Sequence, residues 1–276
     1  MEQRLFGWTG VSVPVIGQGT WEMEQNRASS IAAIRHGLDL GMTHIDTAEM
    51  YGNGKVEDIV GEAIAGRRQE VFLVSKVMPD NASRQGTMTA CERSLRRLRT
   101  EYLDCYLLHW PSRHRLADTI AAFEQLVRDG KIKTWGVSNF DEDRVAEAVR
   151  IGGPNRVACN QVLYHLEERT IEHHILPICE RHNIAIVGYS PFGQGRFRSH
   201  PVLEEIARAR GATPRQVALR FLVRHPSVFT IPKAGRVDHV EENAGTGDLR
   251  LTEDDIRRID EAFPAARPRR RHLPTL

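Results

Sequence analysis

The sequence predicts an α/β fold, a single (β/α)8 barrel (TIM barrel) that occupies residues 1–276 as one domain. Two observations predict it: eight short apolar runs recur along the chain, and helical patterns lie between them. The runs are apolar at consecutive positions, which is typical of parallel strands covered on both faces. No linker-like stretch interrupts the alternation, and 276 residues is an ordinary length for one such barrel.

The first element is a short hairpin that precedes the barrel. The segment LFGWTGVSVPV, residues 5–15, turns at Thr9-Gly10, and we expect it to plug the barrel floor. The barrel strands follow, and they are predicted at 15–19, 42–46, 71–76, 102–109, 132–139, 156–161, 184–189 and 228–233.

Helices are predicted between the strands from apolar spacing and capping residues. In 84–98 and in 115–129 the apolar side chains fall on one stripe of a helix. Thr213 followed by Pro214 predicts a helix start, and Thr252 predicts another. The gap between the last two strands holds two helical patterns, so we expect extra helices in the C-terminal part.

A doubly wound open sheet is the alternative fold. Its nucleotide-binding version needs a G-x-G-x-x-G turn after the first strand. The segment GQGTWE at 17–22 lacks that spacing, which favours the barrel.

The charge balance argues against an overall attraction to nucleic acid or membranes. Lys and Arg total 38 and Asp and Glu total 36, which gives a net charge of +2. The run RPRRRH at 267–272 is interpreted as a solvated basic tail.

The cysteines and the apolar profile predict a cytoplasmic protein. Cys91, Cys105, Cys159 and Cys179 have no C-x-x-C spacing, so we expect reduced and mostly buried thiols. No apolar stretch has the length of a membrane span, and the N-terminus lacks the apolar core of a signal peptide. The sequence leaves the oligomeric state open, and we expect a monomer.

Polar residues close most of the predicted strands. Barrel enzymes build their sites at the C-terminal ends of the strands, so these side chains should converge at one mouth. Each alone has an ordinary structural explanation, but packing does not explain an acid, a lysine and a histidine that close three successive strands. The strand-end residues are Asp46, Lys76, His109, Ser138-Asn139, Asn160-Gln161, Tyr189 and Lys233.

Tyr51 follows Asp46 by five residues and is the candidate proton donor. The pKa of a free tyrosine lies near 10, which makes it too weak an acid to protonate an alkoxide efficiently near neutral pH. We expect the ammonium of Lys76 to lower the pKa of Tyr51, and Asp46 to keep that lysine charged. With His109, these residues predict a site that donates a proton to a carbonyl.

The chain resembles the aldo-keto reductases from about Leu5 to Phe263. The motifs that carry the resemblance are HIDTAEMYGNG, FLVSK, YLLHWP, WGVSNF, CNQVLYH and IPKAGRVDHVEEN, in the order of that family. The resemblance implies a barrel that reduces aldehydes or ketones with NADPH. It also implies that Tyr51 is the general acid, that Lys76 and Asp46 adjust its acidity, and that no metal takes part.

The resemblance further implies roles for the mouth of the barrel. His109 would orient the carbonyl oxygen, and Trp21 and Trp110 would line the substrate pocket together with Tyr51. The residues implied for NADPH are Thr20, Asp46, Ser138, Asn139, Gln161 and Tyr189 around the nicotinamide, with Lys233, Arg236, His239, Glu242 and Asn243 around the adenosine.

Two segments depart from the family pattern. His239 stands where an arginine usually pairs the 2′-phosphate, so NADH use stays open beside NADPH. The loop PFGQGR at 191–196 differs from the serine-bearing version. The C-terminus after the last helix is short, which favours an open pocket for small carbonyls. The chain resembles small bacterial members, some of which reduce methylglyoxal.

Two other functions are weighed against the reductase. A metal-dependent barrel hydrolase needs paired histidines at strand ends, but only His109 closes a strand, and His173-His174 fall in a helical stretch. An NADPH-binding regulatory subunit that acts through a protein partner shares the fold. The set Asp46, Tyr51, Lys76 and His109 favours an enzyme.

Overall fold

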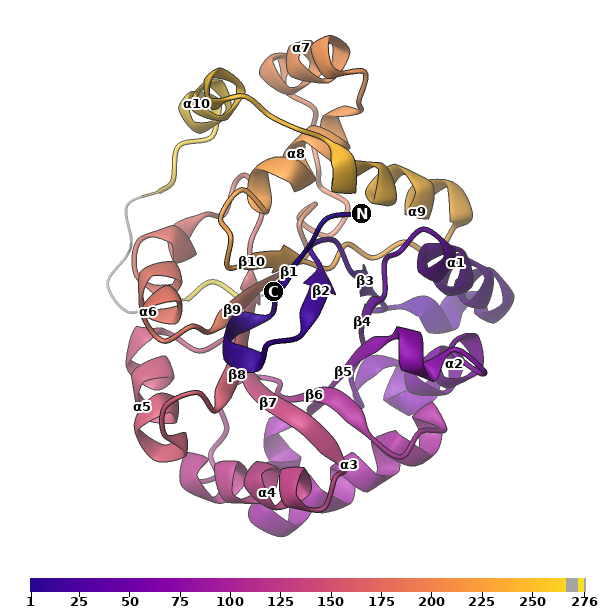
Figure 1. Cartoon of the computed structure of the whole chain (residues 1–276), viewed down its shortest axis with the longest axis vertical. Helices are drawn as coiled ribbons and strands as arrows, with labels where there is room; N and C mark the ends of the chain where they lie inside the picture. Colours follow the sequence, from indigo (N-terminus) through magenta and orange to yellow (C-terminus); the bar gives the residue numbers. More distant parts are fainter. Residues whose placement is uncertain (267–272, 276) are drawn as a thin grey trace.

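Eight parallel strands form one sheet that curls into a barrel with helices around it (Figure 1). In this computed structural model, residues 1–266 and 273–275 are described. The predicted basic tail at 267–272 lies outside the described residues. The strands are β3 (Gln18–Gly19), β4 (His44–Asp46), β5 (Phe72–Val77), β6 (Leu103–Leu108), β7 (Ile132–Ser138), β8 (Val157–Leu163), β9 (Ala185–Tyr189) and β10 (Val228–Thr230).

The strands are arranged in sequence order, and the first meets the last. Each strand pairs in parallel with its neighbour along the chain, from β3 to β10. Parallel bridges join Ile16 to Thr230 and Gly19 to Lys233, which closes the barrel. This closure confirms the predicted barrel and excludes the open sheet.

The helices lie outside the strands (Figure 1). Two of them begin with the predicted residues, because Thr213 and Thr252 each form a capping box with the residue three positions later. The helices are α1 (Arg27–Asp39), α2 (Lys55–Ala63), α3 (Arg84–Leu98), α4 (Leu116–Arg128), α5 (Glu142–Gly152), α6 (Ile175–Arg181), α7 (Pro201–Arg210), α8 (Pro214–Leu222), α9 (Val237–Ala244) and α10 (Glu253–Ala262). The extra helical segments predicted between the last two strands are present: α7 and α8 both lie between β9 and β10.

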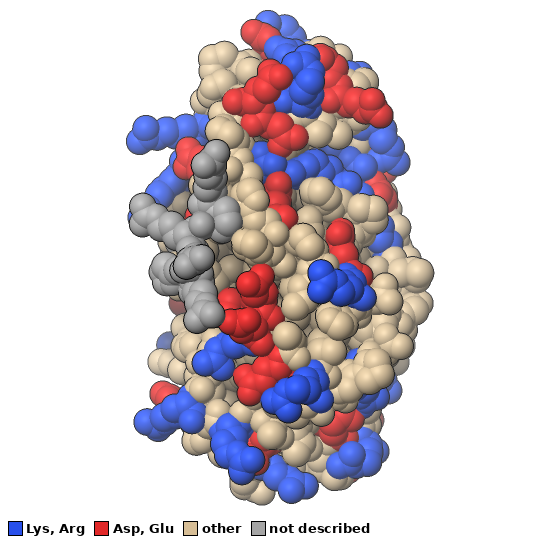
Figure 2. Space-filling view, turned by 90° about the vertical axis from the view of Figure 1, so that its left-hand side faces the viewer, with Lys and Arg blue, Asp and Glu red and all other residues tan. Residues whose placement is uncertain are grey.

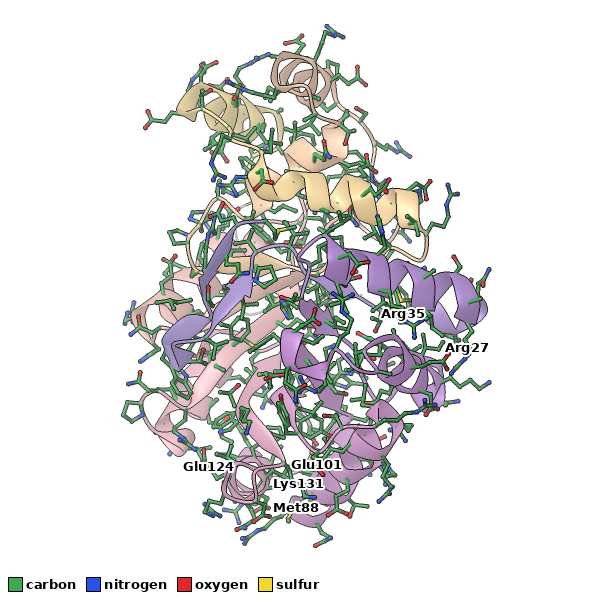
Figure 3. The ribbon with its side chains drawn as sticks, turned by 45° about the vertical axis from the view of Figure 1, so that its right-hand side comes forward. Arg27, Arg35, Met88, Glu101, Glu124 and Lys131 are labelled. Atoms are coloured by element: carbon green, nitrogen blue, oxygen red, sulfur yellow. The ribbon has the colours of Figure 1, made fainter. Side chains whose placement is uncertain are left out.

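Polar side chains join neighbouring helices and strands on the outside of the barrel (Figure 3). Arg27 of α1 pairs with Glu62 of α2, and Arg35 donates to the carbonyl oxygen of Ala63. Glu124 of α4 accepts from the indole nitrogen of Trp135 on β7, at 2.8 Å. The first two contacts join α1 to α2, and the third holds α4 against β7.

The predicted hairpin closes the N-terminal end of the barrel. Strands β1 (Gln3–Leu5) and β2 (Ser12–Pro14) pair in antiparallel fashion. Phe6 lies between them and is fully buried against Phe72 and Phe229, with ring centroids 4.8 and 5.2 Å away. Access to the barrel interior from the floor is therefore blocked by apolar packing.

His44 lies in this apolar floor although it can carry a charge. Its ring is fully buried and meets Phe6 and Phe72 edge-on. Neither ring nitrogen has a hydrogen-bond partner among the described residues. Burial, with the charge of Lys76 acting in the same direction, lowers the pKa of His44 to about 3, so the ring is neutral at physiological pH.

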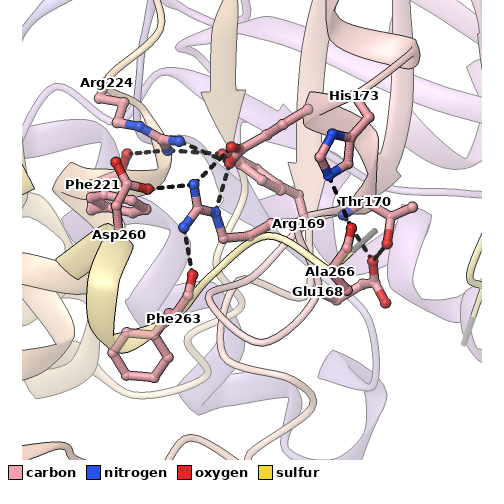
Figure 4. Close-up of polar contacts among 11 residues, drawn as sticks. Glu168, Arg169, Thr170, His173, Phe221, Arg224, Asp260, Phe263 and Ala266 are labelled. Atoms are coloured by element: carbon pink, nitrogen blue, oxygen red, sulfur yellow. Dashed lines mark hydrogen bonds and ion pairs between the residues drawn. The ribbon is translucent and has the colours of Figure 1, made fainter. Parts of the chain in front are cut away.

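A buried arginine fastens the C-terminal helix to the barrel (Figure 4). The guanidinium of Arg169, in the loop after β8, pairs with Glu172 and with Asp260 of α10, and donates to the carbonyl oxygen of Phe263. Arg169 is 4% exposed, and Arg224 pairs with the same Glu172. The end of α10 is thus held beside the loop after β8.

The surface carries both signs of charge. Acidic and basic side chains intermingle over the face drawn in Figure 2, which lies at the left of Figure 1. Within residues 1–266 and 273–275, none of the helices is both long and apolar enough to cross a bilayer.

Candidate active site

The alternation of side chains along the strands brings the predicted polar residues to one mouth. On β5, Phe72, Val74 and Lys76 occupy alternate positions, so all three face the barrel interior. The first two belong to the apolar cluster inside the barrel, and the third stands at the C-terminal end of the strand. The hairpin closes the opposite end, so the polar ends open at the other mouth.

Lys76 is the centre of the hydrogen-bonded network at this mouth. It is fully buried, and its ammonium contacts Asp46 Oδ1 at 2.5 Å, the carbonyl oxygen of Thr47 at 2.8 Å and the hydroxyl of Tyr51 at 3.3 Å. An ammonium has three donors, and all three find acceptors here. Gln161 donates to the second oxygen of Asp46, at 2.7 Å. The carboxylate is therefore fixed from two sides.

Electrostatics keep this lysine charged. Burial alone would lower the pKa of Lys76, but the charges and hydrogen bonds of Asp46 and Tyr51 outweigh burial and raise it. From the sequence, the pKa of Tyr51 was expected to be lowered by Lys76, and this direction was wrong. Burial raises the pKa of Tyr51 above its usual value, and the Lys76 ammonium offsets only part of that rise. The phenol therefore stays protonated at neutral pH, in the form that can donate a proton.

A local turn sets the position of Tyr51. The 3-10 helix Tyr51–Gly54 contains residues with positive φ, and Gly54 has φ of 88°. A side chain at Gly54 would meet Arg97, whose guanidinium lies 2.6 Å from the position of its Cβ. Arg97 in turn pairs with the buried Glu57 of α2 at 2.7 Å. Glycine is thus required where this turn packs against the helix layer.

His109 lies beside the phenol of Tyr51. The two ring centroids are 5.8 Å apart in an edge-on arrangement. Burial and the charge of Lys76 hold the pKa of His109 well below its usual value, so this imidazole is neutral. Its Nδ1 atom is buried without a hydrogen-bond partner among the described residues. A neutral imidazole in this position can donate one N–H to a carbonyl oxygen.

A cavity of about 490 Å³ lies above these residues. That volume suits a small-molecule or cofactor site. Lys76 lies behind Tyr51 and does not line the cavity. The residues singled out from the sequence that line it are Thr20, Trp21, Asp46, Tyr51, His109, Trp110, Ser138, Asn139, Gln161, Tyr189, Lys233 and His239.

Amide and hydroxyl groups form one wall of the cavity. Ser138 donates to the carbonyl oxygen of Gln161 at 2.9 Å, and Tyr189 donates to Asn139 Oδ1 at 2.9 Å. Asn139 also donates to the carbonyl oxygen of His109, at 3.2 Å, from a backbone with φ of 58°. Side chains with donors and acceptors beside the flat ring of Tyr189 fit a nicotinamide, whose carboxamide needs both. Asn160 points away, toward Phe140.

Three residues assigned to the adenosine lie off the cavity wall. Arg236 is 66% exposed and pairs with Asp238. Glu242 accepts from Thr213 at 2.7 Å, and Asn243 is buried. Lys233 lines the cavity close to Gly235, together with His239.

Sequence reasoning missed several residues of the cavity, among them Glu22, Met50 and Arg215. Glu22 and Met50 lie in turns after β3 and β4, and Arg215 lies on α8. None of them closes a strand, so the strand-end pattern gave no signal. Glu22 has φ of 57°, which is uncommon for a residue other than glycine and could have drawn attention only in a structure.

The structure gives no support to the metal-dependent hydrolase. No group of three or more His, Cys, Asp or Glu that could bind a metal ion occurs in the described part of the chain. His173 and His174 precede α6 instead of lying within it, and His173 contacts the carbonyl oxygen of Ala266.

Comparison with known proteins identifies the family of this chain. Residues 15–263 match the Aldo/keto reductase family. The chain is 45% identical over 274 residues to methylglyoxal reductase YeaE of Escherichia coli, covering 96% of both chains. It is 34% identical over 251 residues to glyoxal reductase of Bacillus subtilis, covering 91% of this chain and 89% of that one.

A solved structure has the same architecture. The crystal structure of an aldo/keto reductase from Klebsiella pneumoniae in complex with NADP and acetate superposes with a TM-score of 0.94. The two sequences are 42% identical, and the alignment covers 100% of each chain.

Proposed function

Because this chain belongs to the aldo/keto reductase family, we propose that it reduces small uncharged carbonyls with Tyr51 as the proton donor. The chain is an oxidoreductase that uses NADPH to convert aldehydes or ketones to alcohols. One observation supports the assignment to Tyr51: its hydroxyl is 3.3 Å from the Lys76 ammonium, which Asp46 holds in place.

The proton donor acts together with its neighbours. NADPH, when bound, supplies the hydride that reduces the carbonyl carbon. His109 orients the carbonyl oxygen toward Tyr51, whose hydroxyl gives that oxygen a proton and becomes a phenolate. Lys76 stabilises the phenolate, because a positive charge about 3 Å from a developing negative charge in a dry site interacts strongly. Asp46 keeps Lys76 charged and fixes its direction. The alcohol leaves, and a proton from solvent restores the phenol.

The residues around the cavity suit the cofactor. Asn139, Gln161 and Ser138 offer both donors and acceptors for the nicotinamide carboxamide, with the ring of Tyr189 beside them. Lys233, which precedes α9, and His239, which lies on α9, line the cavity and can contact the adenosine end of the cofactor.

The substrate end of the cavity suits a small neutral carbonyl. Trp21, Met50 and Trp110 supply apolar surface there, and Trp21 is 40% exposed, so the mouth is open. Glu22 also lines the cavity, and a carboxylate at this position disfavours an anionic substrate. Relatives named as methylglyoxal and glyoxal reductases support a small dicarbonyl as substrate class.

We also infer that the chain acts as one domain and as a monomer in the cytoplasm. The four cysteines are unpaired and buried, which suits a reducing compartment.

The test removes only the hydroxyl of Tyr51. In Tyr51→Phe the ring still packs, so we expect the fold and NADPH binding to survive. We expect turnover of methylglyoxal to fall by about two to four orders of magnitude, which is typical of losing a general acid. NADPH oxidation is followed at steady state, and cofactor binding is followed separately by fluorescence.

Tyr102→Phe is the matched control, because its ring packs under Arg68 and Lys133 outside the cavity. It should turn over like the parent. A Tyr51→Phe variant that binds NADPH and reduces methylglyoxal at the parent rate would show that Tyr51 is not the acid. A parent protein that binds NADPH but reduces no carbonyl would instead return the regulatory alternative to consideration.

A further inference from the structure

The adenosine end of the cavity contains an arginine to which the family resemblance assigned no role. Arg215 lies near the N-terminus of α8, and among the described residues it is the one arginine that lines the cavity. Lys233 and His239 line the same cavity, and Arg236 does not. The basic side chains at this end therefore come from three different elements.

The guanidinium of Arg215 is held in a fixed plane. Its central carbon lies 3.9 Å from the ring centroid of Phe192 and 5.6 Å from that of Phe197. Phe192 is buried in an apolar cluster, so the ring under the guanidinium is itself packed against the protein. Stacking of this kind orients the donors of an arginine and reduces the entropy lost when it binds a ligand.

Glu242 fixes one edge of the same guanidinium. Its Oε2 faces Arg215 Nε at 3.6 Å, and its Oε1 accepts from Thr213 at 2.7 Å. Both oxygens thus have partners on the first turn of α8, and Glu242 does not line the cavity. We interpret Glu242 as a positioning residue for Arg215.

The terminal nitrogens of Arg215 remain available. Within residues 1–266 and 273–275 they have no hydrogen-bond partner, and the side chain is 39% exposed. By contrast, the guanidinium of Arg236 is occupied by Asp238 and lies off the cavity wall. A planar, oriented guanidinium with a free pair of N–H groups matches the geometry of a phosphate.

We propose that Arg215, held by Phe192 and Glu242, pairs the adenosine 2′-phosphate and is the main source of discrimination between NADPH and NADH in this chain. The inference rests on the use of NADPH described above. The 2′-phosphate is the only anionic group that distinguishes the two cofactors. Arg215 supplies the guanidinium at this end of the cavity, where His239 supplies an imidazole.

The experiment measures binding and needs no turnover. Dissociation constants for NADPH, NADH, adenosine 2′,5′-bisphosphate and adenosine 5′-diphosphate are determined by fluorescence and by displacement. The variants are Arg215→Gln and Arg215→Lys, with Arg236→Gln as the matched control. Circular dichroism and the melting temperature establish that each variant is folded.

Arg215→Gln should weaken NADPH and the 2′,5′-bisphosphate by about tenfold to a hundredfold, the range of a charge-assisted pair. NADH and the 5′-diphosphate should stay within about twofold of the parent. Arg215→Lys should retain part of the preference, since it keeps the charge but loses the planar fork. Arg236→Gln should bind all four ligands like the parent.

Three results would overturn the inference. Equal losses for NADPH and NADH would assign Arg215 to the adenine or the pyrophosphate. A selective loss in Arg236→Gln, with Arg215→Gln unchanged, would return the role to Arg236. A parent protein that binds neither dinucleotide would remove the cofactor assignment as well, which separates that failure from the failure of Arg215 alone.

Discussion

Replacing His44 should make the protein more resistant to acid. His44 is neutral and fully buried between Phe6 and Phe72, and its pKa is lowered to about 3 by burial and by Lys76. In the unfolded chain the pKa of a histidine is about 6.5. Below pH 6.5 the unfolded state therefore binds a proton at His44 that the folded state does not bind. The free energy of unfolding consequently falls as the pH falls.

The magnitude follows from the two pKa values. Between pH 6.5 and pH 3, each pH unit costs about 1.4 kcal/mol of unfolding free energy, because only the unfolded state is protonated at this site. At pH 5 the folded protein has therefore lost about 2 kcal/mol through His44 alone. This is a large fraction of the stability of an ordinary domain.

Urea unfolding of the parent and of His44→Leu at pH 7.5 and pH 5.0 measures this contribution. Leucine has a similar volume and fits the apolar floor, so the parent should lose about 2 kcal/mol more than the variant between the two pH values. His174→Gln, at a side chain that is 54% exposed, is the control and should follow the parent. If His44→Leu and the parent lose equal stability on acidification, His44 does not stay neutral in the folded state and the reasoning is refuted.

Two further predictions concern the reaction. In Lys76→Met, nothing offsets the effect of burial on Tyr51, so its pKa should rise further; turnover should fall by about tenfold or more, and the alkaline limb of the kcat profile should move to higher pH. An unchanged profile would show that Lys76 does not act through the phenol. Glu22→Gln removes the carboxylate at the cavity mouth, so kcat/KM for glyoxylate should rise severalfold while that for methylglyoxal stays near the parent value. Equal changes for both substrates would exclude a role for the charge.

The strand-end residues were predictable from the sequence because the period of a strand is simple. Lys76 follows an apolar run at an even spacing from Phe72, so its side of the sheet and its end of the barrel follow from the pattern. The starts of α8 and α10 were equally predictable, because Thr213 and Thr252 cap them through local hydrogen bonds. Such features depend on neighbours in the sequence.

The other features of the site depend on packing between segments that are far apart in the sequence. Arg215 reaches the cavity because α8 lies against α9 and because Phe192 supports its guanidinium, and no local pattern carries that information. The direction of the pKa shift of Tyr51 was predicted wrongly because the sequence shows the neighbouring charge but not the depth of burial. His44 likewise stood inside a predicted strand, and only the structure shows that its ring has apolar neighbours.

The closure of the barrel has a consequence for how long the protein survives in a cell. The first and last barrel strands, where the sheet closes, contain only two and three residues. Gly19 and Lys233, which bridge this closure, also line the cavity. A dinucleotide bound in this cavity would contact both sides of the junction and would oppose its opening. At a hundred times its dissociation constant, a ligand specific for the folded state adds about 2.7 kcal/mol. The supply of cofactor would then set the protein's resistance to proteases, so that a cell depleted of NADPH clears this enzyme faster than one that is well supplied.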